Sequence, residues 1–463
     1  MGAQMGEFGL GQAPTAAPAP PAGGSDVPHA MGRPDFVPAE RYYDPVFAGL
    51  EREHLWSRVW QMACRLEEIP SPGDYVEYVI CDQSILLVRV DDATINGYHN
   101  ACRHRATQLA TGTGTFSRGR IVCPFHGWRW SLDGESSFVY GAHTFDEGLL
   151  APGELCLRQV QVDIWGACAW INLDPLAPPL LEALDPMPSL LDPLGIADMR
   201  VQWWKETILQ ANWKLAQEAF MEGYHVPQTH PQLTLGHPDR YDPDSLVYSV
   251  HDHGHSSFQL RPNAQAKKGR QVGVGEVDAI IESVHLLSTG LEAMTLARDV
   301  HVIEGMRNRP IPDGSSFGAE LVKELYQYAA GAGIPLPAPE PSALARWGGV
   351  FFVFPNYFVL PQYGNALVYR VRPNGNDTES CVFELWSLSI PAEHDDVPKP
   401  TLEGPFAPDD SDHWPRIPLQ DFSNIERQQR GVHSRGFDGP RLSRDYEAGI
   451  TNMHVELDRY LSS

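Results

Sequence analysis

The hexapeptide Cys123-Pro124-Phe125-His126-Gly127-Trp128 (CPFHGW) carries two side chains that commonly bind metals. A cysteine thiolate and a histidine imidazole are separated by two residues, and Gly127 lets the chain turn directly after them. A single Cys-x-x-His pair is ambiguous, because such pairs also occur by chance or as buried structural residues. The interpretation therefore depends on whether a second pair lies at a workable distance.

A second pair, Cys102-Arg103-His104, lies upstream, with eighteen residues between His104 and Cys123. Each pair is expected in a loop at the end of a β-hairpin. Two cysteines and two histidines can form a structural zinc site, but zinc fingers usually group the cysteines and the histidines separately. Here each loop offers one sulfur and one nitrogen, which suits a Rieske [2Fe–2S] centre with two cysteines on one iron and two histidines on the other. Zinc remains the alternative.

The segments CRHR (102–105) and CPFHGW (123–128), with the strands around them, resemble the Rieske domain of the Rieske non-haem iron aromatic-ring-hydroxylating oxygenases, specifically of their large, catalytic alpha subunits. The Rieske proteins of respiratory complexes differ, because they carry an additional disulfide-forming cysteine in each loop, where this chain has Thr107 and Phe125. Trp128 is expected to shield the cluster from water. The resemblance implies that the cluster is held by Cys102, His104, Cys123 and His126.

The stretch ANWKLAQEAFMEGYHVPQTH (211–230) predicts a helix that Asn212 caps at its N-terminus. Helical spacing groups two sets of side chains on opposite faces. The apolar face, expected in the core, comprises Trp213, Ala216, Phe220 and Tyr224, and the polar face comprises Glu218, Glu222 and His225. Pro227 should end the helix, so that the chain can bring His230 back beside His225. Two histidines and a distant carboxylate form the facial triad of non-haem Fe(II) oxygenases.

The family motif of an acid, two residues, His, four residues and His matches Glu222, His225 and His230. The resemblance implies that the two histidines bind the mononuclear iron and that Asp421, ahead of Gln429-Arg430-Gly431, is the third ligand. On chemistry alone, Glu426 and Glu222 compete with Asp421.

The resemblance assigns Glu222 a bridging role. The matching acid of relatives hydrogen-bonds an iron-ligand histidine of its own subunit, here His225, and a cluster-ligand histidine of the neighbouring subunit, here His126. Such a carboxylate orients both rings and offers a short route for the electron. Glu218 also matches a family acid, and we expect it to anchor the helix.

The pattern along the chain predicts an α+β protein with four segments. Residues 1–37, rich in Ala, Pro and Gly, are expected to be a disordered tail, and 38–63 a helical segment. Alternating apolar residues and turns at Asn96-Gly97 and Asp133-Gly134 predict an antiparallel all-β Rieske domain over 64–178. Residues 185–463 should form the catalytic domain, for which the resemblance implies a central antiparallel sheet flanked by helices (a helix-grip, START-like fold).

Composition excludes several classes of protein. The 463-residue chain has a net charge of −24, which argues against nucleic-acid and membrane partners. No apolar run could cross a bilayer and no secretion signal is evident, and an odd number of cysteines indicates a reduced, cytoplasmic setting. The cysteines outside the two loops should be buried small hydrophobes: Cys64, Cys81, Cys156, Cys168 and Cys381. His251, His253 and His255 alternate and could bind zinc on a strand, although an exposed loop or a wall of the substrate cavity is the simpler interpretation.

The implied function is the terminal oxygenase component of a multicomponent Rieske system. A separate ferredoxin or flavin reductase would supply electrons from NAD(P)H, and the mononuclear iron would use O2 to cis-dihydroxylate a small aromatic or other apolar substrate. One alternative is a Rieske monooxygenase that hydroxylates or demethylates its substrate, and another is an electron carrier without oxygenase chemistry. The bridging role of Glu222 predicts a homotrimer, with or without a small beta subunit.

Overall fold

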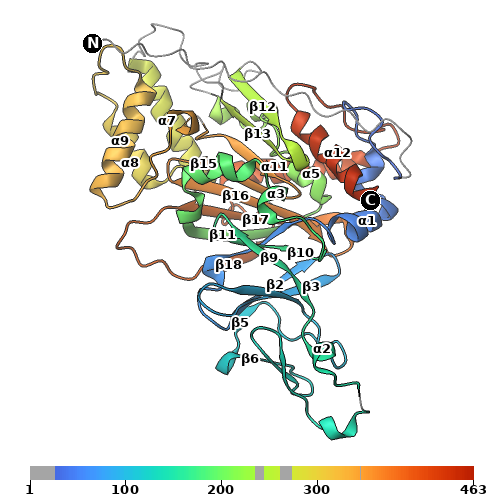
Figure 1. Ribbon diagram of the computed structural model, residues 1–463. Helices are drawn as coiled ribbons and strands as arrows, with labels where there is room; N and C mark the ends of the chain where they lie inside the picture. The colour runs from blue at the N-terminus through green and yellow to red at the C-terminus, as the bar shows by residue number, and fades with distance from the viewer. Residues whose placement is uncertain (1–26, 147, 235–244, 261–273, 345, 463) are drawn as a thin grey trace, which may run out of the picture.

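The computed structural model describes residues 27–146, 148–234, 245–260, 274–344 and 346–462. A small β-rich lobe, made mainly of residues 61–172, projects from a larger lobe built around one long sheet (Figure 1). Within the described residues, no helix is long and apolar enough to cross a membrane.

The small lobe contains two antiparallel sheets. The first has the strand order β1-β10-β9-β4-β3-β2-β5: Gln61–Arg65, Cys168–Asn172, Gln159–Trp165, Ile95–His99, Gln83–Arg89, Asp74–Ile80 and Thr113–Thr115. The second is a three-stranded sheet of β6 (Arg120–Val122), β7 (Arg129–Ser131) and β8 (Ser136–Phe138). A one-turn helix, α2 (Pro152–Leu155), precedes β9. The segment CPFHGW is the loop that joins β6 to β7.

The large lobe is built on an eight-stranded sheet. Its order is β12-β13-β14-β15-β16-β17-β11-β18: Leu246–Val250, Ser256–Leu260, Val350–Val353, Tyr357–Gln362, Asn365–Asn374, Asp377–Ser389, Arg200–Leu209 and Leu402–Phe406. All neighbours are antiparallel except β11 and β18, which run parallel. This sheet, with helices against it, confirms the predicted α+β class.

Helices cover both faces of the long sheet. One face packs against α5 (Trp213–Glu218) and α11 (Arg416–Val432), and α6 (Val226–Thr229) follows α5. The short helices α3 (Leu180–Ala183), α4 (Met187–Leu191) and α10 (Pro341–Leu344) pack on the other face with residues of β1 and β10. The remaining helices lie at the ends of the sheet: α1 (Pro45–Leu50), α7 (Val274–Leu291), α8 (Ala297–Gly305), α9 (Phe317–Gly331) and α12 (Ala448–Leu461) (Figure 1).

A buried ion pair joins the two lobes. Arg370 on β16 forms two hydrogen bonds, of 2.7 and 2.8 Å, to the Glu384 carboxylate on β17. The same guanidinium donates to the carbonyl oxygens of Met62 and Ala63 on β1, at 3.0 and 2.6 Å. Because both charges are buried and every contact is a charge-assisted hydrogen bond, this pair fixes β1 against the large sheet.

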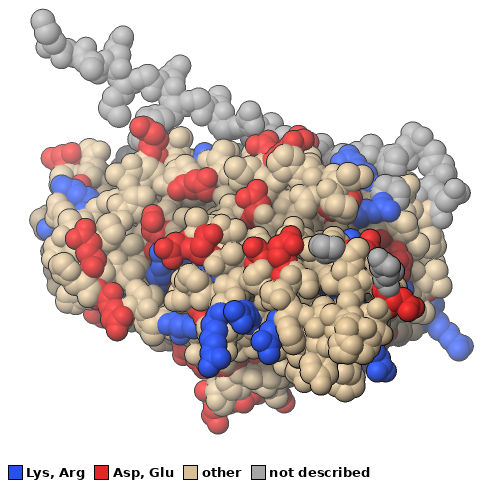
Figure 2. All heavy atoms as spheres, turned by 60° about the horizontal axis from the view of Figure 1, so that its bottom comes forward, with Lys and Arg blue, Asp and Glu red and all other residues tan. Residues whose placement is uncertain are grey.

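Charge is unevenly distributed over the surface. Figure 2, in which the small lobe is turned toward the viewer, shows acidic side chains spread widely over this face. Lys and Arg side chains gather instead beside the projecting lobe. By sequence, residues 61–172 carry 13 acidic and 8 basic residues, a net charge of −5 out of −24, so the excess negative charge belongs mainly to the rest of the chain.

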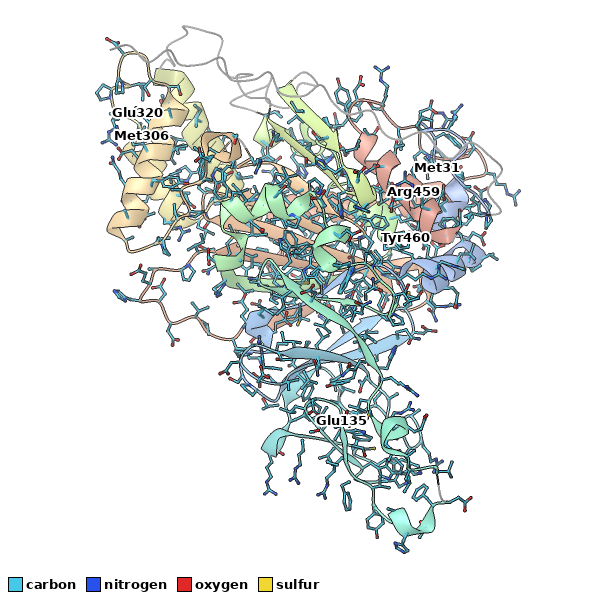
Figure 3. The ribbon with its side chains drawn as sticks, in the orientation of Figure 1. Met31, Glu135, Met306, Glu320, Arg459 and Tyr460 are labelled. Atoms are coloured by element: carbon cyan, nitrogen blue, oxygen red, sulfur yellow. The ribbon has the colours of Figure 1, made fainter. Side chains whose placement is uncertain are left out.

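The N-terminal boundary differs from the prediction. Residues 1–26 lie outside the described part of the chain, but residues 27–37, expected to belong to the tail, pack against the large lobe. Met31 lies beside α12, close to Arg459 and Tyr460 (Figure 3), and its backbone N–H donates to Asp458 at 2.8 Å. The side chains of Met31 and Val37 are buried, at 4% and 0% exposure.

Two local predictions in the small lobe are wrong. The helix expected to reach residue 63 stops earlier, because a π-helical turn ends at Leu55 and Gln61 begins β1. Asn96-Gly97 is not a turn but part of β4, and the hairpin turns at Asp91–Thr94 instead. A Cβ at Gly97 would lie 2.6 Å from Val160 on β9, so this glycine serves close strand packing. The Asp133-Gly134 turn is confirmed between β7 and β8.

Candidate metal centres

Three predicted ligands converge in the large lobe. The structure brings the side chains of His225, His230 and Asp421 together, with one ligand atom of each within 4.8 Å of the others. The Asp421 carboxylate lies 2.9 Å from Nε2 of His230 and 3.7 Å from Nε2 of His225. Among the described residues, this is the one group of three or more His, Cys, Asp or Glu side chains arranged to hold a metal ion. Two imidazoles and one carboxylate fit Fe(II) and leave further coordination positions open.

Each histidine is oriented through its other ring nitrogen. Nδ1 of His225 lies 2.7 Å from Oε1 of Glu222, whose second oxygen accepts the backbone N–H of His225 at 3.0 Å. Nδ1 of His230 lies 2.9 Å from Oε1 of Gln420, which also accepts from the side chain of Gln232 at 2.7 Å. With these acceptors at Nδ1, both rings present Nε2 toward Asp421, as metal-binding histidines do. Gln420 belongs to no ligand motif, and its position one residue before Asp421 is the signal in the sequence that points to it.

Electrostatics favour a cation at this centre. Burial alone would lower the pKa of His225, but the carboxylates of Glu222 and Asp421 outweigh burial and raise it. The same negative charge would stabilise a bound metal ion. Asp421 is 5% exposed and His230 is 2% exposed, so little water reaches these two side chains.

The local backbone explains how the two histidines meet. The expected continuous helix ends after Glu218, where α5 stops, and α6 begins only at Val226. Between them the chain passes close to β12, because a Cβ at Gly223 would lie 2.9 Å from Leu246 and the Gly223 N–H donates to the Tyr248 hydroxyl. Tyr224, expected in the core, is consequently 62% exposed. The break lets His225 and His230 face each other, with ring centroids 5.3 Å apart.

The competing carboxylates have other partners. Glu426 accepts the backbone N–H of Gln210 and takes no part in the centre. Glu218 is buried, accepts hydrogen bonds from the Tyr42 hydroxyl and lies 2.9 Å from Nε2 of His454. Burial raises its pKa to about 8, which agrees with the expected structural role.

The four donors of the small lobe form two pairs. Nδ1 of His104 faces Nδ1 of His126 at 3.2 Å, and the thiols of Cys102 and Cys123 are neighbours. Burial raises the pKa of Cys102, and the adjacent Cys123 thiol adds to the shift. Trp128, which is 3% exposed, stacks on the His104 ring at 4.9 Å. The Phe125 ring lies 3.9 Å from that of His126 and is 60% exposed.

This pairing distinguishes the two candidate metals. A mononuclear zinc site needs all its ligand atoms around one point, but no three of these four side chains place their ligand atoms within 4.8 Å of one another. A [2Fe–2S] cluster places the sulfurs on one iron and the imidazoles on the other. The separate thiol pair and imidazole pair fit that group.

The two centres lie in different lobes. The loops around residues 102–104 and 123–126 are at the end of the small lobe, whereas α6 and α11 lie over the large sheet (Figure 1). Among the described residues, no hydrogen bond or ion pair connects Glu222 or His225 with either loop of the small lobe. An open surface groove of about 770 Å³ passes beside the triad, and Gln228, Thr229 and Gln420 are among its lining residues.

Neither the His251–His255 segment nor the cysteines outside the two loops form a second metal-binding group in the described part of the chain. His251, His253 and His255 do not alternate on a strand, because Asp252–Gly254 forms a 3-10 turn. His255 is buried, and its ring accepts the Phe354 N–H at 2.8 Å and lies 3.0 Å from the Ala183 carbonyl. The cysteines outside the loops are buried except Cys156, which is half-buried.

Comparisons with known proteins assign a family model to each lobe. Residues 59–140 match the model of the Rieske [2Fe-2S] domain, and residues 196–463 match that of the ring hydroxylating alpha subunit (catalytic domain). The glycine betaine monooxygenase oxygenase subunit of Chromohalobacter salexigens is 32% identical over 427 residues, covering 90% of this chain and 84% of that protein. The chloroplastic choline monooxygenase of Spinacia oleracea is 29% identical over 203 residues, 42% of this chain and 44% of that protein.

Solved structures share the fold at lower identity. The quaternary ammonium Rieske monooxygenase CntA in complex with L-carnitine has a TM-score of 0.62 at 18% identity, covering 92% of this chain and 96% of that chain. Naphthalene 1,2-dioxygenase with indole bound has a TM-score of 0.64 at 18% identity, covering 93% and 92%. The chain therefore belongs to the family of ring-hydroxylating alpha subunits, and it is a Rieske non-haem iron oxygenase with a [2Fe–2S] domain and a mononuclear iron domain.

Proposed function

We propose that the protein is the oxygenase component of a monooxygenase that hydroxylates a small quaternary ammonium compound at a carbon bonded to nitrogen. The observation that carries this proposal is the similarity to a glycine betaine monooxygenase over 90% of the chain. It favours the monooxygenase alternative over arene dihydroxylation, because the likeness to naphthalene dioxygenase, at 18% identity, concerns the fold alone. The catalytic-domain match contradicts the interpretation as a pure electron carrier.

We assign the ligands by the geometry of the two centres. His225, His230 and Asp421 would hold the mononuclear iron, and the cluster would be held by Cys102, His104, Cys123 and His126. When bound, the mononuclear iron supplies O2 activation with electrons delivered through the cluster. Glu222 and Gln420 keep Nδ1 of the two histidines hydrogen-bonded, so that both Nε2 atoms point to one place.

A cluster of packed aromatic rings lies near Asp421. The Phe220 ring lies 4.7 Å from that of Tyr369 and 5.3 Å from that of Phe383, which in turn contacts Phe422 at 5.5 Å. Burial raises the pKa of Tyr369, and the negative charge of Asp421 adds to this. Aromatic faces attract quaternary ammonium groups by cation–π interaction.

The proposed reaction balances in atoms, electrons and protons. One C–H bond next to the positive nitrogen is replaced by C–OH, and O2, two electrons and two protons yield this hydroxyl group and one water. The hydroxylated product then breaks its C–N bond and releases a tertiary amine, an aldehyde and a proton. We propose that a separate donor protein supplies the electrons.

The electron route predicts an oligomer. Because Glu222 and the cluster loops are not in contact within one chain, we propose that Glu222 meets His126 of a neighbouring subunit in a head-to-tail trimer. A solved structure of CntA that covers 92% of this chain, with a TM-score of 0.61 at 18% identity, is described as giving insight into inter-subunit electron transfer in that protein.

A single-turnover experiment tests the proposed reaction without a donor protein. Holoenzyme is reduced anaerobically with dithionite, freed of excess reductant, and mixed with oxygenated buffer and either glycine betaine, choline, L-carnitine or naphthalene. Mass spectrometry should detect a tertiary amine from at least one ammonium substrate and no diol from naphthalene. A cis-diol from naphthalene, with no amine product, would contradict the proposal.

A matched pair of variants tests the ligand assignment. Asp421→Ala should abolish product formation, because it removes the carboxylate of the triad, and it should keep the visible spectrum of the cluster. Glu426→Gln, on the same helix but bonded to Gln210, should keep most of the activity. If Asp421→Ala retains its mononuclear iron by elemental analysis, the assignment of Asp421 is wrong.

A further inference from the structure

The outer face of the three-stranded sheet β6-β7-β8 carries positive charge on an acidic protein. Residues 100–145 contain five arginines and only two acids, whereas the whole chain has a net charge of −24. The five are Arg103, Arg105, Arg118, Arg120 and Arg129. None of them forms an ion pair with a described residue: Arg103 donates to the Glu154 carbonyl, and Arg105 and Arg129 lie over aromatic rings.

Strand register places the charges on one face. Val122 on β6 is opposite Arg129 on β7, and Arg129 is opposite Phe138 on β8, so these side chains point the same way. Arg120 precedes Val122 by two residues and shares their face. The alternate residues Ile121 and Trp130 point inward and are 0% exposed.

The same face is partly apolar and is not covered by the described chain. Val122 is 42% exposed and Phe138 is 41% exposed, with the Arg129 guanidinium 4.7 Å from the Phe138 ring centroid. Arg118, in the 3-10 turn Ser117–Gly119 before β6, and Arg120, the first residue of β6, are exposed. Arginines around a small apolar patch are typical of surfaces that bind an acidic partner transiently. Figure 2 shows Lys and Arg side chains gathered beside the small lobe.

The face is directly connected to the cluster loop. β6 ends at Val122 and β7 begins at Arg129, so the two strands enclose residues 123–128, which contain Cys123 and His126. A redox centre that delivers its electron through one face while held in an oligomer must receive it through another. In the proposed route the His126 edge delivers the electron to Glu222 of a neighbour, which leaves the sheet face for reception.

We infer that the β6-β7-β8 face, through Arg118, Arg120 and Arg129, is the docking surface for an acidic electron-transfer protein that reduces the cluster. This inference rests on the proposed electron route but not on the identity of the substrate. One electron passes from the reduced iron–sulfur centre of the donor to the oxidised cluster, and no bond is broken. Long-range attraction between the arginines and donor carboxylates would accelerate encounter and weaken as salt increases.

The test uses a plant-type [2Fe–2S] ferredoxin, an acidic protein of low potential, as the probe. Its affinity for the oxidised holoenzyme is measured by calorimetry at several salt concentrations. Stopped-flow absorbance at the cluster bands gives the rate at which the pre-reduced ferredoxin reduces the cluster. The double variant Arg120→Glu/Arg129→Glu is compared with Arg33→Glu/Arg444→Glu, which makes the same charge change at arginines that are 60% and 83% exposed elsewhere.

The sheet variant should bind ferredoxin about tenfold or more weakly at low salt and lose most of the salt dependence, since two attractive charges become repulsive. Its reduction by ferredoxin should slow by a similar factor, while reduction by dithionite and the cluster spectrum stay unchanged. The control variant should match the wild type within twofold. Wild-type affinity in the sheet variant, or an equal loss in the control, would overturn the inference.

The alternative partner for the β6-β7-β8 face is a second copy of this chain. If the sheet variant changes the oligomeric mass in sedimentation experiments while its cluster spectrum is intact, the face is a subunit contact and the inference is overturned. If the mass is unchanged and ferredoxin binding falls, the inference holds whichever substrate the enzyme oxidises. Failure of every ammonium substrate in the single-turnover test would therefore be a separate result.

Discussion

At the scale of single residues, the iron centre depends on the acceptors at Nδ1 of its histidines. A carboxylate, Glu222, holds His225, whereas an amide, Gln420, holds His230. The amide adds no charge beside His230, so the centre has one charged and one neutral supporting group. Partners of this kind fix the tautomer and the orientation of a metal-binding ring.

Replacing Gln420 should weaken the iron centre without unfolding the protein. Gln420→Leu removes the acceptor from His230 Nδ1 at nearly constant volume, and we expect iron affinity or turnover to fall by roughly ten- to a hundredfold. Gln420→Glu keeps an acceptor and should restore much of the loss. Competition with a chelator, followed by elemental analysis, measures the iron affinity independently of activity.

Two measurements would show whether the effect of Gln420→Leu is confined to the iron centre. The visible spectrum of the cluster should be identical in both Gln420 variants. Asn424→Ala, an exposed neighbour on α11 that also lines the groove, should leave the iron affinity unchanged. Equal iron affinity in Gln420→Leu and the wild type would show that His230 needs no such partner.

At the scale of secondary-structure elements, a buried polar network ties the N-terminal segment, α5 and α12 together. The Tyr42 hydroxyl donates to Glu218 on α5, which lies 2.9 Å from His454 on α12. Arg41 pairs with Asp458 at 2.6 Å with both side chains almost fully buried. Since α5 leads directly to Glu222 and His225, this network positions the first part of the iron site.

The network predicts a pH dependence of stability. The pKa of Glu218 is raised to about 8 by burial, above its usual value of 4.5, so folding favours the protonated acid. Its contribution to stability is complete below about pH 4.5 and is lost as pH rises through about 8. Glu218→Gln stays neutral, so its urea midpoint should fall less between pH 6 and 8.5 than that of the wild type.

The control for this measurement is the replacement of an exposed acid, Glu53, whose side chain is 64% exposed. The urea midpoint of Glu53→Gln should change with pH in parallel with that of the wild type. If the urea midpoint of Glu218→Gln also changes with pH in parallel with the wild type, Glu218 is ionised in the folded protein at pH 6.

At the scale of the whole molecule, the separation of the two centres within one chain predicts complementation between defective subunits. Cys102→Ser chains lack a cluster ligand, Asp421→Ala chains lack an iron ligand, and each homo-oligomer should be inactive. In a head-to-tail trimer that contains both, one junction joins an intact cluster to an intact iron site, so mixed trimers should recover about one third of wild-type turnover. Differently tagged chains, co-expressed and purified by both tags, provide the sample.

Inactive mixed oligomers would contradict this prediction. If doubly tagged oligomers form and remain inactive, electrons pass within one subunit and the proposed contact between Glu222 and His126 of a neighbouring subunit is wrong. Wild-type chains carrying the same two tags control for the effect of the tags on turnover.

Several features of this protein could be predicted from the sequence because they depend on contacts between nearby residues. The spacing of Cys102, His104, Cys123 and His126 in two loops indicated a two-iron cluster, and the turn at Asp133-Gly134 needed only its own residues. The substrate class was harder to predict. The resemblance implied arene cis-dihydroxylation, with monooxygenation as an alternative, whereas we propose monooxygenation of a quaternary ammonium compound from the similarity to a glycine betaine monooxygenase.

Other features were decided only by tertiary structure, because they arise where distant segments pack. The helix after Asn212 breaks at residue 219 because the chain must pass close to β12 at Gly223, a strand whose position no local pattern reveals. Gly97 resembles a turn residue in sequence but lies in β4 under Val160. Gln420 accepts a hydrogen bond from His230 although 190 residues separate them in the chain. The basic face of β6-β7-β8 arises from strand register, which places side chains of three strands next to one another.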